Sequence, residues 1–515
     1  MSDAPQPPIA FVGFMGAGKT TAARVVGDAL GEPVVDADEQ FVLRTGETIS
    51  EHFQRHGEAA FREREEQITL ELLGGGGVVA LGGGAVESPR IREALKGAVT
   101  VLVEVDVGEA WRRSRDSGRP LAMDFDAFQA RYEARRSLYT EVADAILPPG
   151  DADQPGRAAP WLARLRAAPG IQMAWARSAS AEYPVLVGPG AVDFAGQAVG
   201  PGRLFALADR EAAQALPELL PGHEQLLEVT GGEQAKTLRQ AEQLLETLLT
   251  AGVRRDDTLA AFGGGVVGDL AGFCAAVYLR GVPVVQIPTT LVAQVDSAYG
   301  GKTGVDLPAA KNAVGSFHLP QAVLADPAAL RTLPAAELAA GFAEVVKTAL
   351  LAGGALWERV RVIDALDAAA LDGVIFDCAR TKLAVVAADE RDTGARAALN
   401  LGHTVGHGIE AAGAYGRYRH GEAVGLGMLA ALRLSDASHL RGEVAELLAL
   451  HGLPTALDAT VETDAVMQAM THDKKQAAGG LGFVLLSEPG HVEVGHRVDE
   501  ADIRAAIDEL RGSPR

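Results

Sequence analysis

The segment IAFVGFMGAGKTTAARVVGDAL, residues 9–30, decides the fold of the first part of the chain. The apolar run IAFV is followed by a glycine-rich turn and then by a pattern typical of a helix. The spacing G-x-x-x-x-G-K-[ST] is completed by Gly13, Gly18, Lys19 and Thr20. Because glycines let backbone N–H groups wrap phosphate oxygens at a helix N-terminus, the segment predicts a nucleotide phosphate loop. Lys19 would reach the outer phosphates and Thr20 would bind Mg²⁺, whereas the simpler reading is a glycine turn with an unrelated lysine.

Short apolar runs alternate with helical patterns over residues 1–168, which predicts a parallel sheet covered by helices. A change of character at residues 169–180 predicts a linker. Further apolar runs, RLFALAD, TLAAFGGG and VPVVQIPTT, predict an α/β subdomain over residues 181–333. Ala- and Leu-rich segments predict an all-α subdomain over residues 334–515. The expected fold class is therefore α/β, with a helical subdomain at the end.

The composition limits the kinds of partner that the chain can bind. Of 515 residues, 47 are Lys or Arg and 68 are Asp or Glu, so the net charge is −21. This charge argues against a broad nucleic-acid surface, and anionic substrates must meet local basic clusters instead. No apolar run is long enough to cross a bilayer, and the first residues do not resemble a secretory signal. Cys274 and Cys378 are expected as buried thiols rather than a disulfide, which fits a cytoplasmic protein.

Polar residues follow the later strands of the first half. Asp36 and Asp38 end the run PVVDAD, and open α/β sheets bind their ligands at such strand ends. Further along the chain stand Arg62, Gly82, Gly83, Gly84, Arg119 and Arg136. Each arginine alone is typical of a solvated helix, but the whole pattern resembles shikimate kinase over residues 8–168. A gluconate or nucleotide kinase is the alternative, which the paired aspartates and the glycine triplet disfavour.

The resemblance to shikimate kinase implies a role for each of these residues. Asp36 would support Mg²⁺ together with Thr20, and Asp38 would bind a substrate hydroxyl and accept its proton. Arg119, in the short acidic stretch RDSGRPLAMDFDAF, would come from a closing lid and stabilise charge on the transferring phosphoryl group. The implied contacts to ATP are Gly13, Gly16, Gly18, Lys19, Thr20, Thr21 and Arg119. The implied contacts to shikimate are Asp38, Arg62, Gly82, Gly83, Gly84 and Arg136.

A second glycine-rich turn lies in AAFGGGVVGDLAGF, between an apolar run and a helical pattern. Gly263, Gly265 and Gly268 fit the G-x-G-x-x-G dinucleotide fingerprint, which is a weak signal alone. The sequence lacks the acidic residue expected about 20 positions later, which argues against an ordinary Rossmann site and leaves a diphosphate cradle. Other residues with suitable nucleotide-binding chemistry are Asp209, Glu233, Lys236, Thr289 and Thr290.

The stretch LNLGHTVGHGIE, residues 399–410, places His403 and His407 on one face of a helix. The two rings could bind one metal ion together, could divide metal binding and proton transfer, or could do neither. Basic and amide residues accumulate in the same half of this acidic chain. They are Arg280, Lys302, Lys311, Asn312, Lys347, Lys382, Arg396, Asn400, Lys474 and Lys475. Solvated lysines are the simpler reading, although glycine and apolar neighbours disfavour exposure of Lys302 and Lys347.

Motifs over residues 172–512 resemble 3-dehydroquinate synthase, in family order: GGGVVGDLAGF, IPTTLVAQVDSAYGGKTGVD, GFAEVVK, ADERDTGARAALNLGHTVGH, HGEAV and HDKK. The resemblance implies conversion of 3-deoxy-D-arabino-heptulosonate 7-phosphate to 3-dehydroquinate and phosphate, with NAD and Zn²⁺ or Co²⁺ as cofactors. It implies that the metal ligands are Glu344, His403 and His420. The implied catalytic residues are Lys302, Lys347, His407, Arg280 and Asn400, with His407 assisting proton transfer.

The same resemblance implies two binding sets. The set for NAD is Asp209, Glu233, Lys236, Gly264, Gly265, Val266, Asp269, Thr289, Thr290 and Lys311. The set for the substrate is Asp296, Lys302, Asn312, Lys347, Lys382, Arg396, Asn400, Lys474 and Lys475. We therefore expect a bifunctional enzyme of aromatic amino-acid biosynthesis, and a homodimer through the synthase half is left open. Rival interpretations are a polyol dehydrogenase, another sugar phosphate cyclase, or a half that has become a regulatory or scaffolding module.

Overall fold

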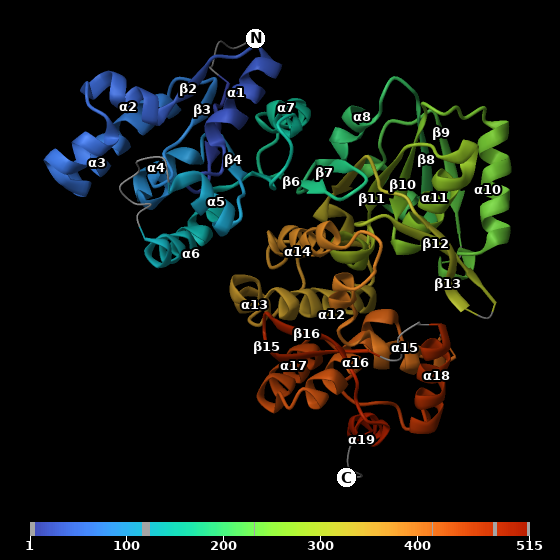
Figure 1. The fold of residues 1–515 in the computed structure, drawn as a ribbon. Coiled ribbons are helices and arrows are strands. Elements are labelled where there is room, and N and C mark those ends of the chain that lie inside the picture. The colour runs from blue at the N-terminus through green and yellow to red at the C-terminus, as the bar shows by residue number, and fades with distance from the viewer. Residues whose placement is uncertain are drawn as a thin grey trace. The chain divides into compact units, whose positions relative to one another are not determined.

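The fold is given by a computed structural model (Figure 1), which describes residues 6–115, 124–230, 232–308, 310–414, 416–476 and 482–511, without the side chains of 471–476. The chain divides into two compact units. The first unit comprises Met1–Arg177 and Glu182–Gly188, and the second comprises Ser178–Ala181 and Pro189–Arg515.

The first unit is a sheet covered by helices, as the sequence predicts. Its strands are β1 (Ile9–Val12), β2 (Val34–Asp36), β3 (Val78–Ala80), β4 (Val99–Val103), β5 (Ala145–Leu147), β6 (Gln172–Arg177) and β7 (Glu182–Val187). The order is β2-β3-β1-β4-β5-β6-β7, parallel except for the antiparallel β6–β7 pair. Its helices are α1 (Lys19–Leu30), α2 (Ala37–Thr45), α3 (Ile49–Leu73), α4 (Pro89–Leu95), α5 (Val107–Ser114), α6 (Phe125–Val142) and α7 (Gln154–Leu165).

The predicted strand, loop and helix of residues 9–30 are confirmed. Every residue of β1 is buried, as expected for a central parallel strand. The loop turns through Gly13 and Gly18, whose φ angles of 144° and 90° suit glycine alone. Helix α1 then begins at Lys19 and ends at Leu30, and Gly31 after it adopts the left-handed conformation common at that position.

Residues 169–180, predicted as a linker, instead contain strand β6. The backbone N–H of Met173 donates to the carbonyl of Asp144 at 2.8 Å, and β6 pairs in parallel with β5. The run from Met173 to Ala176 is buried. Turn-like residues on both sides hide this strand in the sequence, so the first unit extends past residue 168.

The second unit begins with parallel strands, in the order β14-β11-β10-β8-β9. Its strands are β8 (Leu204–Asp209), β9 (Gln225–Val229), β10 (Thr258–Gly263), β11 (Val284–Pro288) and β14 (Ala322–Ala325), and a separate hairpin is formed by β12 (Lys302–Leu307) and β13 (Ala310–Phe317). The helices of this part are α8 (Ala195–Ala198), α9 (Arg210–Ala215), α10 (Leu238–Thr250) and α11 (Gly265–Val277). One buried cluster joins Leu207, Leu244 and Leu270, so α10 and α11 share a core with the sheet.

The rest of the second unit is mainly helical. Its helices are α12 (Ala335–Ala352), α13 (Gly354–Val360), α14 (Val374–Ala388), α15 (His403–Ala412), α16 (His420–Leu434), α17 (Ser438–Leu450), α18 (Thr463–Gln476) and α19 (Glu500–Leu510). Figure 1 shows α15 to α19 gathered at the C-terminal end of this unit, in orange and red. The part predicted as all-α also holds an antiparallel hairpin, β15 (Phe483–Glu488) with β16 (His491–His496). Within the described part of the chain, no helix combines the length and the apolar character needed to span a bilayer.

Candidate active sites

The phosphate loop of the first unit holds its lysine over the loop backbone. The Nζ of Lys19 donates to the carbonyl of Phe14 at 3.2 Å. Gly16 is partly buried, whereas Gly18 and Thr21 are exposed at the start of α1. This geometry leaves the first N–H groups of α1 directed at an open space in which phosphate oxygens could bind.

Two oxygen ligands suited to Mg²⁺ lie together beside this loop. The hydroxyl of Thr20 donates to Asp36 Oδ2 at 2.6 Å. Asp36 also caps α2, because its Oδ1 accepts the backbone N–H groups of Asp38 and Glu39 at 2.8 and 3.2 Å. A hydroxyl and a carboxylate at this spacing are hard oxygen donors, so they fit a Mg²⁺ ion that retains several waters.

The glycine triplet makes room for a buried ion pair. Arg62 donates to Glu65 Oε2 at 2.5 Å, and a Cβ on Gly84 would overlap the Arg62 guanidinium. A Cβ on Gly82 would lie 3.2 Å from Asp38 Oδ1. Burial raises the pKa of Glu65, and Arg62 offsets only part of this effect. The predicted residues Asp38, Arg62 and Gly82 to Gly84 therefore surround one polar site, with Glu65 as a member that the sequence did not indicate.

The structure favours Arg135 over the predicted Arg136 at this site. Arg135 is buried, and its guanidinium donates to the carbonyl of Gly83 at 3.3 Å and to Glu87 Oε2 at 2.7 Å. Tyr139, one turn later, donates to the same carbonyl at 2.5 Å. Arg136 is exposed, because the inward face of α6 passes through Phe128, Arg135 and Tyr139. The phase of α6 therefore places Arg135 at this site, one position before the predicted Arg136.

The predicted lid arginine, Arg119, lies outside the described residues. Its role remains as the resemblance implies it.

The second glycine-rich turn forms a cradle at the start of α11. Gly264 caps this helix, and a Cβ there would lie 2.9 Å from Thr290 Cγ2. A Cβ on Gly265 would lie 2.9 Å from Ser297 Oγ. Gly265 and Val266 are partly exposed at the start of α11, where the sequence predicts a diphosphate cradle. The Thr289 N–H donates to the Gly263 carbonyl at 3.0 Å, which joins β10 and β11 at the turn.

Charged residues predicted to bind NAD gather beside this cradle. The Nζ of Lys236 donates to Asp269 Oδ2 and to Asn312 Oδ1, each at 2.5 Å. Lys311 Nζ lies 3.7 Å from Glu233 Oε1. Burial raises the pKa of Asp269, and its interaction with Lys236 opposes this effect. Asn312, predicted to contact the synthase substrate, thus pairs with a residue of the predicted NAD set.

Asp209 also takes its predicted place near a strand end. It is the last residue of β8, and its side chain caps α9 by accepting the Ala212 N–H at 2.9 Å. The end of a parallel strand is where this fold class binds nucleotides.

A buried group of lysines and carboxylates is formed by residues of α12 and α14 together with Asp296. Lys347 Nζ lies 2.5 Å from Glu344 Oε2, and both side chains are almost completely buried. Lys382 donates to Asp296. Burial raises the pKa of Asp296, but Lys347 and Lys382 outweigh it and bring the pKa down to about 2. Burial lowers the pKa of Lys382, and Asp296 restores part of it. Four charges held out of water in this way can orient an anionic substrate.

The predicted metal ligands come together from three helices. Glu344 lies on α12, whereas His403 and His420 begin α15 and α16. Glu344 Oε1 lies 3.7 Å from His403 Nε2 and 3.3 Å from His420 Nε2. This buried oxygen has no hydrogen-bond partner among the described residues. Two imidazole nitrogens that face an unpaired carboxylate oxygen form a ligand set that fits a catalytic Zn²⁺ or Co²⁺ ion.

Hydrogen bonds and local charges set the state of both rings. His403 Nδ1 lies 3.2 Å from the Leu401 carbonyl, which directs its Nε2 at Glu344. Burial and Lys347 lower the pKa of His403 to about 3, so the ring is neutral and able to bind a metal. Burial lowers the pKa of His420, but Glu344 and Glu410 outweigh it and raise the pKa to about 10. Metal binding at His420 would therefore release a proton.

Close helix packing positions the three ligands. A Cβ on Gly427 of α16 would overlap the carbonyl of Gly402, just before His403. A Cβ on Gly421 would overlap the carbonyl of Ala340 on α12. Both positions therefore need glycine, and they bring α16 against α12 and α15 beside His420.

Glu410 is a member of this site that the sequence did not single out. Its Oε2 lies 3.3 Å from His420 Nδ1, and its Oε1 lies 3.6 Å from Lys311 Nζ. It lies one turn after His407, on the same helix. The i, i+3 spacing between His407 and Glu410 was the only local sequence pattern that could have indicated Glu410. The contact between Glu410 and His420 depends on how α15 and α16 pack.

The remaining predicted residues occupy different surroundings. His407 is exposed, with its ring 5.3 Å from that of His403, and it joins Glu410 and His420 in a second possible ligand set. Lys302 pairs with Asp392 on the surface. Arg396 is buried and donates to the carbonyls of Gly300 and Glu390 at 3.2 and 2.9 Å.

Four further predicted residues are less informative. Arg280 is exposed on the turn after α11, with a φ angle of 69°, and Asn400 is exposed before α15. Lys474 and Lys475 lie on α18, but their side chains are outside the described residues.

Three family models match the chain. The model for shikimate kinase matches residues 15–159. The model for the 3-dehydroquinate synthase N-terminal part matches residues 226–340, and that for the C-terminal part matches residues 341–476. The order of the matches is the order of the two motif sets along the chain.

Individual known proteins are similar to parts of this chain. A 3-dehydroquinate synthase from Desulforamulus reducens is 44% identical over 292 residues, which are 55% of this chain and 81% of that protein. The solved 2-epi-5-epi-valiolone synthase from Streptomyces hygroscopicus, with NAD⁺ and Zn²⁺ bound, is 27% identical with a TM-score of 0.59, over 65% of this chain and 99% of that one. A shikimate kinase from Acinetobacter baumannii, solved with shikimate, is 32% identical over 32% of this chain and 94% of that one, with a TM-score of 0.30.

Proposed function

The chain belongs to the 3-dehydroquinate synthase family and carries a shikimate kinase domain ahead of it, and on this premise we propose the two reactions of a bifunctional enzyme. The first unit transfers the γ-phosphoryl group of ATP to the 3-hydroxyl of shikimate. The second unit converts 3-deoxy-D-arabino-heptulosonate 7-phosphate to 3-dehydroquinate and phosphate. The observation that carries the proposal is the convergence of Glu344, His403 and His420 beside two buried lysines, in a chain that also has a complete phosphate loop.

In the kinase reaction, the protein mainly positions charge. Lys19 and the N–H groups of the loop would bind the outer phosphates of ATP, and Thr20 with Asp36 would hold Mg²⁺. Asp38 binds the attacking hydroxyl of shikimate and accepts its proton. The lid residue Arg119 stabilises charge on the transferring group, as the resemblance implies.

The carboxylate of shikimate is held by arginines beside the glycine triplet. Arg62 lies against Gly84, and Arg135 donates to the Gly83 carbonyl. A planar guanidinium can bind both oxygens of a carboxylate, which a lysine cannot do. We therefore assign Arg62 and Arg135 to this role, with Arg135 in place of Arg136.

In the synthase reaction, Glu344, His403 and His420 would hold Zn²⁺ or Co²⁺, and the cradle at α11 would hold NAD. When bound, the metal supplies Lewis acidity and NAD supplies a hydride acceptor that is restored in each turnover. Glu410 fixes the orientation of His420, and His407 moves a proton near the reacting carbons. Because these groups lie on three packed helices, the substrate ring would be held in one orientation.

Lysines of the same unit bind the two anionic ends of the substrate. Lys347 and Lys382 are buried next to Asp296, so their charges act in a poorly screened environment. Lys302 and the Lys474–Lys475 pair complete the proposed phosphate and carboxylate contacts, with Arg396 supporting the Gly300 turn. Arg280, Asn312 and Asn400 are assigned by resemblance.

Two other chemistries could use a similar fold. A polyol dehydrogenase would share the metal and NAD but would have no use for Lys347 and Lys382. A different sugar phosphate cyclase would use them, and the cyclase from Streptomyces hygroscopicus is 27% identical, against 44% for the dehydroquinate synthase from Desulforamulus reducens. A regulatory or scaffolding half would not need complete ligand sets in both units.

We also propose a cytoplasmic enzyme, consistent with the buried free thiols of Cys274 and Cys378, that forms a homodimer through the synthase half.

Separate supply of each substrate tests the proposal. With shikimate and MgATP, the protein should form shikimate 3-phosphate. With 3-deoxy-D-arabino-heptulosonate 7-phosphate, NAD and Zn²⁺, it should release one phosphate for each dehydroquinate, without net NADH. Accumulation of NADH would instead favour the dehydrogenase, and a carbocycle other than dehydroquinate would favour another cyclase.

A further inference from the structure

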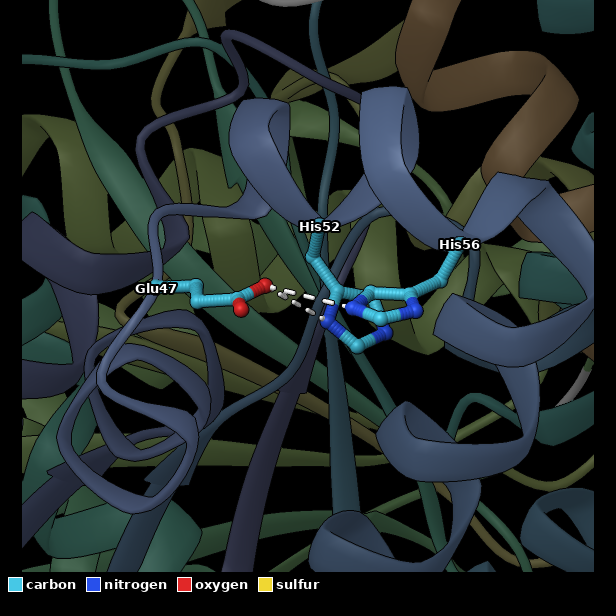
Figure 2. A group of neighbouring side chains, drawn as sticks. All are labelled: Glu47, His52 and His56. Atoms are coloured by element: carbon cyan, nitrogen blue, oxygen red, sulfur yellow. Dashed lines mark ion pairs between the residues drawn. The ribbon is translucent and has the colours of Figure 1, made fainter.

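A second group of one carboxylate and two imidazoles lies in the first unit, outside the proposed kinase residues (Figure 2). Glu47 precedes α3, and His52 and His56 lie one turn apart on that helix. Glu47 Oε2 lies 3.3 Å from His52 Nδ1 and 3.7 Å from His56 Nε2. Figure 2 shows both rings turned toward the Glu47 carboxylate.

Local structure holds these three side chains in place. The hydroxyl of Thr48 accepts the Glu51 N–H, and the Glu51 carboxylate accepts the Thr48 N–H, so the start of α3 is fixed by a capping box. The helical backbone continues to His56 and is interrupted at Gly57, where φ is 82° and ψ is 171°. The i, i+4 spacing therefore places both rings on the same face of α3, and this face is turned toward Glu47.

The polar atoms of this group lack ordinary partners. Glu47 Oε2 and both ring nitrogens of His52 are buried, and none has a hydrogen-bond partner among the described residues. The rings of His52 and Phe41 pack in a T-shaped arrangement, with ring centroids 5.1 Å apart. Because buried polar atoms without partners are unfavourable, Glu47 Oε2 and His52 Nδ1, which lie 3.3 Å apart, indicate that a ligand for lone pairs is missing between them.

We propose that Glu47, His52 and His56 form a binding site for Zn²⁺. Imidazole ligands favour late transition ions over Mg²⁺ and Ca²⁺, which prefer oxygen donors. Tetrahedral ligands at the usual Zn–N and Zn–O lengths are about 3.3 Å apart. The separations of 3.3 and 3.7 Å from Glu47 Oε2 are close to this value, and all three ligand atoms lie within 4.8 Å of one another, with water completing the shell.

One neighbouring charge weakens this site. Arg55 donates to Glu47 Oε1, so it leaves Oε2 for the ion but places a positive charge next to it. His56 is also more exposed than His52, with 43% of its side chain accessible against 14%. We therefore expect weaker binding than at Glu344, His403 and His420. A bound ion would join the segment between α2 and α3 to the first turns of α3.

A zinc titration of the metal-stripped, full-length protein tests this site. The intact chain should bind two ions of different affinity. In both Glu47→Gln and His56→Ala, the weaker ion should bind at least about 100-fold less tightly, since even an indirect partner of a metal ligand is worth 10- to 100-fold. Arg55→Ala should tighten the weaker site. His496→Ala is the matched control, because His496 is an exposed histidine that pairs with Glu493, and it should change neither ion.

The outcomes separate this site from the proposed synthase metal. His403→Ala should remove the tighter ion and leave the weaker one, so the weaker ion can be observed even if the synthase assignment fails. His56→Ala is the primary variant because His56 is exposed, and circular dichroism should find it folded like the parent. Unchanged affinities for both ions in folded Glu47→Gln and His56→Ala would overturn the proposal, as would a single zinc in the intact chain that only His403→Ala removes.

Discussion

The two units each contain one carboxylate and two histidines at matching separations, but in different surroundings. Both groups have oxygen-to-nitrogen distances of 3.3 and 3.7 Å. Glu344 is completely buried beside Lys347, and its histidines come from two other helices. Glu47 is partly exposed beside Arg55, and its histidines share α3. Ligand chemistry alone therefore does not make a catalytic centre. What distinguishes the Glu344 group is the buried lysines that can hold an anionic substrate next to the metal.

The largest difference should come from removing a metal ligand of the synthase group. In a His56→Ala chain, which lacks the second proposed site, His403→Ala should remove bound zinc and abolish dehydroquinate formation. His407→Ala should retain about one zinc per chain and slow the reaction about 10²- to 10⁴-fold, the usual contribution of a positioned acid or base. Metal analysis of the folded proteins, combined with product assays, measures both effects. Equal loss of zinc in the two variants would mean that His403 and His407 chelate together.

A smaller effect should come from the carboxylate that orients His420. Glu410→Gln should weaken zinc binding at the synthase site about 10- to 100-fold, because the amide no longer holds the ring as a carboxylate does. Competition with a chelator of known affinity measures the change. Glu443→Gln, which removes a surface partner of Arg361, provides the comparison and should leave zinc affinity unaltered. If both variants kept the parent affinity, Glu410 would have no part in the site.

The smallest effect should separate two neighbouring arginines of the kinase unit. Arg135→Lys should raise the KM for shikimate by about 10-fold or more, since a charged hydrogen bond contributes about 1.5–3 kcal/mol. Arg136→Lys should leave KM within about twofold, because Arg136 is exposed and surface charges contribute little. Initial rates at saturating MgATP give both values. The reverse order of effects would restore Arg136 as the shikimate ligand.

Local sequence patterns predicted the parts of the sites that a single element determines. The spacing from Gly13 to Thr20 predicted the loop between β1 and α1, and the polar ends of strands located Asp36 and Asp209. The loop and the two aspartates could each be predicted because each depends on backbone geometry near the end of a single strand. Helix phase was also present in the sequence, but the inward position of Arg135 requires knowing which face of α6 packs on the sheet.

Contacts between elements that are distant in the sequence could not be predicted from local residue patterns. The pair His403 and His407 was visible by spacing, yet the ligand group takes His420 from a different helix, and only the family resemblance indicated it. Glu410 and Glu65 became visible only through packing. The same holds for Glu47, because its approach to His52 depends on the turn between α2 and α3.

The central claim is that one chain carries two chemically independent sites, and Lys19→Met tests it most directly. Lys19 lies on the phosphate loop, so its loss should abolish formation of shikimate 3-phosphate from MgATP and shikimate. Both activities should be measured on the same purified sample. The account predicts that dehydroquinate formation stays within about twofold of the parent, since none of the proposed synthase residues lies in the first unit. A parallel fall of both activities in a folded protein would contradict it.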